Sequence, residues 1–119
     1  MSNPIVLLIF RVCFYGALMA GCVLAFSPLD RALHANFDDK LLHYAGFFVL
    51  GLLSFLSHPR VPLIWLALML SGFGLFIEVV QAYIPFRSFS LADWAADAAG
   101  ACSAYLLIVF ILLCAAKKS

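Results

Sequence analysis

The sequence predicts an all-α membrane protein, a bundle of four transmembrane helices with short loops. Of its 119 residues, 66% are hydrophobic and 11% are charged, and the mean hydropathy is +1.12. A soluble domain is roughly half apolar, so this composition excludes a water-soluble globule. Four spans of about 20 residues each use roughly 80 residues. The chain therefore holds one domain, residues 1–119, and has no room for a second.

Prolines and polar residues divide the chain into four apolar runs. The predicted spans cover about residues 5–26, 39–57, 62–84 and 91–116. Pro28 and Pro85 stop the first and third, since proline cannot continue a helix. The polar segment 27–38 is predicted to be a loop or an interfacial helix, and Asp38 or Asp39 is a candidate N-cap for the second span.

Neither the net charge nor the cysteines indicate a nucleic-acid or metal ligand. The formal net charge of +1 is too small to attract nucleic acid. The cysteines lie inside apolar runs without metal-binding spacing, and we interpret them as small core or lipid-facing residues: Cys13, Cys22, Cys102 and Cys114. Residues 18–22 resemble a lipobox, but the apolar run continues past Cys22, which favours a retained first span.

Small residues recur at every fourth position of the last span: Ala92, Ala96, Gly100 and Ala104. This spacing lets helix backbones approach closely in lipid, so we expect that face to pack against another helix.

An even number of spans places both termini on one side of the membrane. That side holds Arg60 and the Lys117-Lys118 tail, with Arg11 near its boundary, and the other side holds Arg31, Lys40 and Arg87. The excess of positive charge beside the termini predicts that both are cytoplasmic, with segments 27–38 and 85–90 outside.

Ionisable residues converge near the outer end of the predicted bundle. Counted from the helix ends, His43 lies roughly 6 Å, Glu78 roughly 9 Å and Asp97 roughly 10 Å below the surface. Charged groups are costly in hydrocarbon, so such residues usually face an internal site. Gln81 shares a helix face with Glu78, as Asp93 does with Asp97.

Several of these polar residues can also be explained by a purely structural role instead of a functional site. Ser90 and Asp93 have the spacing of a capping box at the start of the last span. Lys40 and Arg87 can extend to the lipid headgroups from helix ends. Glu78 and Asp97 lie away from helix ends, so capping does not explain them.

Three blocks in the chain resemble the signature blocks of the VanZ-like membrane protein family. The matching positions are Asp39, Lys40 and His43, then Glu78 and Gln81, then Arg87, Ser90 and Asp93. The resemblance covers about residues 38–100. It implies a protein of the bacterial inner membrane with a role in the cell envelope or in resistance to glycopeptide antibiotics.

Two classes of function remain open. The favoured one is a site that binds an anionic envelope lipid or glycopeptide-type headgroup, with Lys40, Arg87 and His43 as its cationic side. The alternative is an intramembrane hydrolase or transferase in which His43 or Glu78 acts as general acid-base. A divalent-metal site at His43, Glu78, Asp93 and Asp97 is chemically possible but lacks a diagnostic spacing, so no cofactor is expected.

Overall fold

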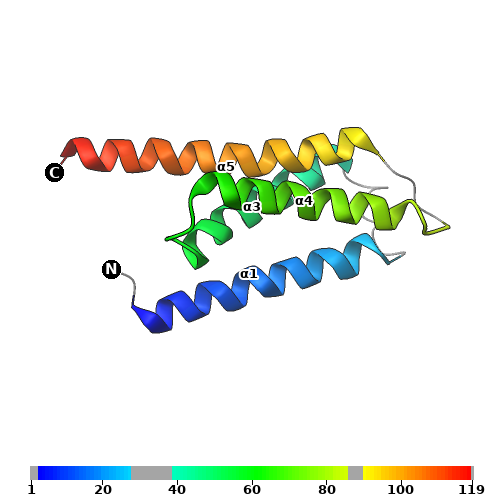
Figure 1. Cartoon of the computed structure of the whole chain (residues 1–119), viewed down its shortest axis with the longest axis horizontal. Helices are drawn as coiled ribbons and strands as arrows, with labels where there is room; N and C mark the ends of the chain where they lie inside the picture. The colour runs from blue at the N-terminus through cyan, green and yellow to red at the C-terminus, as the bar shows by residue number, and fades with distance from the viewer. Residues whose placement is uncertain (1–2, 28–38, 86–89, 119) are drawn as a thin grey trace.

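The computed structural model describes residues 3–27, 39–85 and 90–118, which form four α-helices. These are α1 (Pro4–Ala25), α3 (Asp39–Ser57), α4 (Leu63–Gln81) and α5 (Leu91–Lys118). Each is long and apolar enough to cross a membrane, which confirms the predicted fold class. Consecutive helices run in opposite directions, so both ends of the chain lie at one end of the bundle (Figure 1). We call this the terminal end and the opposite one the loop end.

Several helix boundaries differ from the prediction by one to three residues, and two of these differences have local reasons. The first helix begins at residue 4 because the Asn3 side chain accepts a hydrogen bond of 2.8 Å from the Ile5 N–H. The third predicted span ends at Gln81 instead of residue 84, and the Ile84 N–H bonds back to the Gln81 carbonyl, three residues earlier. Pro85 disfavours helical geometry in the residue before it, which explains this tight final turn. Residues 28–38 of the predicted segment 27–38, and residues 86–89 of the predicted segment 85–90, lie outside the described residues.

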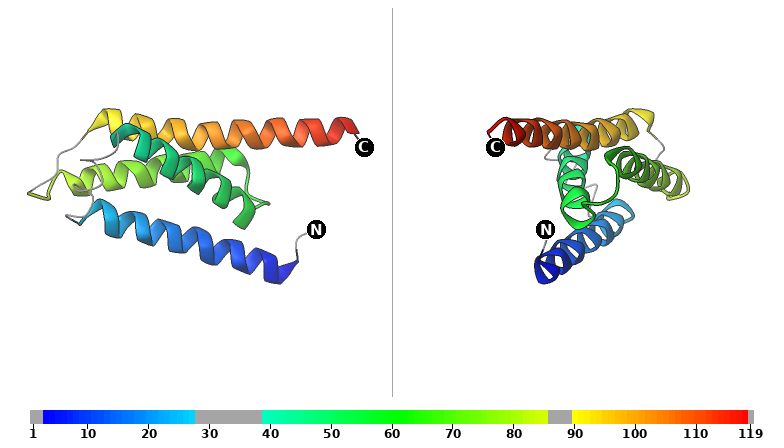
Figure 2. Two further views of the ribbon diagram at one scale, coloured as in Figure 1. Left: turned by 180° about the vertical axis from the view of Figure 1, so that it is seen from behind. Right: turned by 60° about the vertical axis from the view of Figure 1, so that its left-hand side comes forward.

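Helix α3 packs mainly against α5 on one side and α1 on the other, and α4 packs mainly against α5 (Figure 2). Glycines allow the contact between α3 and α5 to be close. A Cβ on Gly100 would collide with the backbone of Tyr44 and Phe48. A Cβ on Gly51 would lie 2.7 Å from the Cβ of Ala104. Substitution at either glycine therefore pushes the two helices apart.

The predicted small-residue face is correct only for its C-terminal half. Gly100 and Ala104 are buried against α3, whereas Ala92 is exposed. At its N-terminal end, the buried face of α5 instead passes through Asp93 and Asp97. The first turns of α5 therefore direct carboxylates into the bundle.

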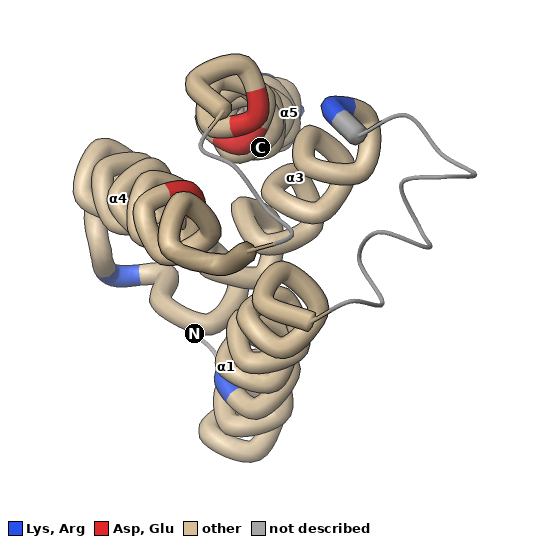
Figure 3. Tube along the Cα trace, turned by 90° about the vertical axis from the view of Figure 1, so that its right-hand side faces the viewer, with Lys and Arg blue, Asp and Glu red and all other residues tan. Residues whose placement is uncertain are grey.

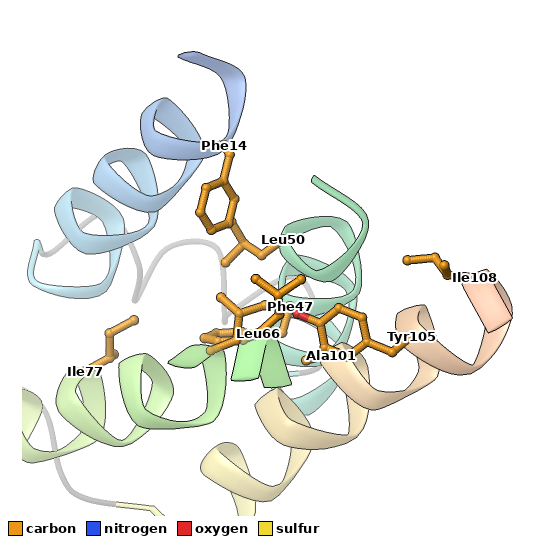
Figure 4. Close-up of a cluster of buried hydrophobic side chains, with 9 residues drawn as sticks. Phe14, Phe47, Leu50, Leu66, Ile77, Ala101, Tyr105 and Ile108 are labelled. Atoms are coloured by element: carbon orange, nitrogen blue, oxygen red, sulfur yellow. The ribbon is translucent and has the colours of Figure 1, made fainter. Parts of the chain in front are cut away.

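The interior contains an apolar cluster whose side chains meet near the middle of the bundle (Figure 4). Yet the largest fully buried side chains are polar: Glu78, Asp97, Ser54 and Ser57. Large apolar side chains cover the outside, as the exposed Leu106 and Phe110 of α5 illustrate. Lipid tails are as apolar as leucine, so burying a leucine side chain lowers the free energy of the bundle little in a bilayer. Polar side chains, by contrast, are stabilised by hydrogen-bond partners in the bundle interior.

Candidate functional site

His43 lies in the second turn of α3 and faces α5. Its Nδ1 is 2.6 Å from Oδ1 of Asp97, which is fully buried. A carboxylate can only accept a hydrogen bond, so Nδ1 carries the proton. The bond orients the ring so that Nε2 faces Asp93, whose Oδ2 is 3.8 Å away.

Gly74 of α4 provides the space that Asp97 occupies. A Cβ at position 74 would lie 2.8 Å from Asp97 Oδ2 and 3.2 Å from Asp97 Cβ. Any larger residue would have to displace the carboxylate or separate α4 from α5. The position of the His43 ring therefore depends on a glycine in a helix that His43 does not belong to.

The start of α5 is capped by Ser90, which directly precedes it, together with Glu78 of α4. The Ser90 hydroxyl accepts a hydrogen bond of 3.2 Å from the Asp93 N–H, which is one half of the predicted capping box. In the other half, the Ser90 N–H donates to Glu78 Oε2 at 3.1 Å instead of to Asp93. Glu78 thus takes the capping role expected of the Asp93 side chain, and the Asp93 carboxylate lies beside His43.

Glu78 is fully buried in α4, and its second oxygen has no hydrogen bond from the described residues. One ligand atom each from His43, Glu78 and Asp93 lies within 4.8 Å of the others. We call His43, Glu78, Asp93 and Asp97 the carboxylate–histidine cluster. Figure 3 views the loop end, where the acidic segments of α4 and α5 lie on facing sides of these helices.

Two further predicted site residues lie at the border of the cluster. The Lys40 side chain is 61% exposed, and its Nζ is 4.0 Å from Asp93 Oδ1. Gln81 is buried, but its Nε2 donates to the Ala25 carbonyl at 2.9 Å and so ties α4 to the end of α1. Lys40 thus stands between the cluster and the outside, while Gln81 holds two helices together.

Two predicted site residues cannot be placed in this geometry. Asp39 is the first residue of α3, but its side chain is outside the described part of the chain. Arg87 lies outside the described residues altogether. The place of Arg87 on the cationic side of the site stays a prediction.

A cavity of about 440 Å³ lies between α1, α3 and α4. His43 and Gln81 line its polar end, and the rest of its wall is apolar, with Gly46 and Phe73 among the lining residues. Wall residues such as Val49 are exposed on the bundle surface, so the cavity opens sideways. We call it the lateral groove. The lateral groove connects the apolar outside of the bundle with the imidazole ring of His43.

A second polar network at the terminal end was missed by sequence reasoning. The Arg11 Nε donates to the Ser57 carbonyl at 3.0 Å. The His58 ring lies between the Tyr15 hydroxyl, 2.9 Å from Nε2, and the Ser57 hydroxyl, 2.9 Å from Nδ1. The spacing of Arg11 and Tyr15, four residues apart on one helix face, was the available signal.

A bundle of four long apolar helices that exposes many large apolar side chains and buries its carboxylates has the character of a polytopic membrane protein. Comparison with protein families gives the more specific assignment. The chain belongs to the VanZ/LLP1 family, whose model matches residues 25–113. This confirms the resemblance carried by the three sequence blocks, and the match includes the whole carboxylate–histidine cluster. Neither a curated protein nor a solved structure matched the chain.

Proposed function

We propose that this protein binds a lipid of the bacterial cell envelope. The headgroup would lie at the carboxylate–histidine cluster and one acyl chain in the lateral groove. The observation that carries this proposal is the groove itself, apolar along its walls and ending at His43 and Gln81. Its volume of about 440 Å³ lies within the range of about 300 to 1,000 Å³ typical of small-molecule sites.

The charges around the cluster restrict the headgroup. Lys40 is exposed beside the cluster and would attract a phosphate or carboxylate, and Arg87 would add a planar fork for the same group. Farther inside, the buried carboxylates favour hydrogen-bond donors. The headgroup that fits both is anionic and also carries hydroxyl or amine groups, as a phosphorylated sugar or a glycopeptide-type group does.

The groove is tested by filling it. In Gly46→Leu the new side chain would project into the groove, whereas Gly72→Leu changes a glycine of α4 that does not line it. Native mass spectrometry of protein extracted with its own membrane should show a lipid on the wild type and on Gly72→Leu. Loss of that lipid from Gly46→Leu alone supports the proposal. Equal lipid retention in both variants would contradict it.

The headgroup is tested at Arg87. Arg87→Ala should release the same lipid, and Arg87→Lys should restore only part of the binding, because lysine lacks the bidentate fork. Lys117→Ala, at the other end of the bundle, is the matched loss of one positive charge. If the three variants retain equal amounts of lipid, Arg87 does not hold the headgroup.

The bond between Asp97 and His43 favours catalysis as a second candidate function. A buried carboxylate 2.6 Å from Nδ1 holds an imidazole as a general base requires. An intramembrane hydrolase or transferase would then use His43, with Glu78 as a second acid-base group. Incubation with the copurified lipid should yield a product that disappears in His43→Gln and Glu78→Gln. A lipid recovered unchanged from the wild type would leave binding as the function.

A further inference from the structure

We propose that His43, Glu78 and Asp93 bind one divalent transition-metal ion, with Zn²⁺ and Mn²⁺ as the fitting candidates. The inference goes beyond lipid binding and does not depend on it. Three atoms no more than 4.8 Å apart all lie within 4.8/√3, or about 2.8 Å, of one point. Zinc bonds to nitrogen and oxygen measure about 2.0 to 2.2 Å, so side-chain shifts of well under about 1 Å close the site.

Glu78 provides the observation that distinguishes this site from a simple group of acids. The residue is fully buried, its Oε2 accepts from the Ser90 N–H, and its Oε1 has no hydrogen bond from the described residues. A buried carboxylate oxygen without a donor is unfavourable, and a bound cation removes that cost. The Ser90 bond also leaves Oε1 as the oxygen available for a metal.

Asp97 orients the histidine as in known metal sites. Metal-binding histidines usually donate their second ring N–H to a carboxylate, which sets the tautomer and the direction of the coordinating nitrogen. The bond of 2.6 Å from His43 Nδ1 to Asp97 has this form, and Nε2 faces Asp93. Asp97 would therefore be a positioning residue for the ligand His43.

The ligand types of the cluster indicate which ions fit. One imidazole and two carboxylates suit zinc or manganese, and three protein ligands leave positions open for water or a phosphate oxygen.

Metal titration of delipidated protein in detergent tests the site separately from lipid binding. After chelator treatment, the wild type should bind one Zn²⁺ or Mn²⁺ per chain by calorimetry and elemental analysis. Glu78→Gln keeps the shape of the side chain and removes its charge, and it should weaken binding by at least about ten-fold. Asp97→Asn should weaken it by about 10- to 100-fold. His58→Gln changes a histidine bonded to Tyr15 and Ser57 at the other end and should leave affinity unchanged.

If a variant fails to fold, a spectrum of Mn²⁺ bound to the wild type tests the metal site instead. Bound Mn²⁺ should show coupling to one imidazole nitrogen in electron paramagnetic resonance, as coordination by His43 requires. A wild type that binds neither ion would overturn the proposal. So would a folded Glu78→Gln with wild-type affinity, or a manganese spectrum without nitrogen coupling. Lipid retained by a wild type that binds no metal would remove the metal site and leave the proposed function standing.

Discussion

Two glycines of α4, two residues apart, differ in what a side chain would meet. A Cβ on Gly74 would lie 2.8 Å from an Asp97 oxygen, whereas a Cβ on Gly72 has nothing within 4 Å. Gly74 therefore determines where the Asp97 carboxylate lies, and through it the orientation of the His43 ring. Gly72 has no such role.

We expect Gly74→Ala to lower the melting temperature in detergent and to weaken metal binding, because it displaces the Asp97 carboxylate. Gly72→Ala should stabilise the protein by up to about 0.5 to 1 kcal/mol, since alanine loses less backbone entropy in a helix. Thermal unfolding of both variants in the same detergent measures the difference. Equal melting temperatures would show that the Asp97 pocket tolerates a methyl group.

Ser90 and Asp93 were predicted together as a capping box, but in the structure they have different roles at the start of α5. Ser90→Ala removes the side-chain acceptor of the Asp93 N–H and should cost about 1 kcal/mol, within about 0.5 to 2. Asp93→Ala leaves this capping bond in place, because the Ser90 hydroxyl accepts from the backbone N–H of residue 93 and not from its side chain. We expect Ser90→Ala to lower the melting temperature with lipid binding kept at low temperature. Full stability with lost binding would instead place the Ser90 hydroxyl in the site.

At the scale of elements, α1 is attached near its middle and at its C-terminal end. Phe14 is its one buried residue among those described. Next to it, near the middle of the helix, Tyr15 bonds to His58, and at the loop end Gln81 bonds to the Ala25 carbonyl. The lateral groove lies between α1 and its neighbours. An element held by a few hydrogen bonds can move without disturbing the contact between α3 and α5.

Loss of one of these bonds should loosen α1 locally. Tyr15→Phe removes the hydroxyl that contacts His58, which is worth about 0.5 to 1.5 kcal/mol. Hydrogen exchange should therefore rise in the N-terminal half of α1 and stay unchanged in α5. Tyr83→Phe is the control, since Tyr83 is 86% exposed beyond the end of α4. Unchanged exchange in α1 would mean that apolar packing alone holds it.

At the scale of the molecule, α5 is longer than a bilayer is thick. Its 28 residues span about 42 Å, against a hydrocarbon core of about 30 Å. The Lys117 and Lys118 side chains mark its far end and belong in water or among headgroups. Because Asp93 and Asp97 of the carboxylate–histidine cluster lie in the first turns of the same helix, the site and this basic tail lie at opposite ends of the bundle.

The orientation of the bundle stays a prediction. We expect both termini in the cytoplasm, so the cluster should open toward the outer side of the membrane. Single cysteines at positions 88 and 119, in a chain without its four native cysteines, test this with an impermeant thiol reagent. Ser88→Cys should react in intact cells and Ser119→Cys only after lysis. The reverse pattern would invert the assignment.

Much of the fold was predictable because hydropathy is a local property. Each span is a run of apolar residues, and proline ends a helix wherever it occurs, so four helices follow from the chain alone. Predicted ends differed by up to three residues where a cap or tight turn intervened, as at Asn3 and Gln81. Depth along a helix is also local, and it predicted that His43, Glu78 and Asp97 lie at similar levels.

What only the tertiary structure decided is which atoms meet across helices. Glu78 caps α5 in place of Asp93, Gln81 bonds to the end of α1, and His58 bonds to Tyr15 of α1. Each of these contacts joins separate segments of the chain, and each depends on helix rotation and separation. Those are set by packing at a few glycines, such as Gly74 and Gly100. The sequence by itself thus determined a membrane bundle with acids at one end, and packing between helices determined that these acids share one histidine.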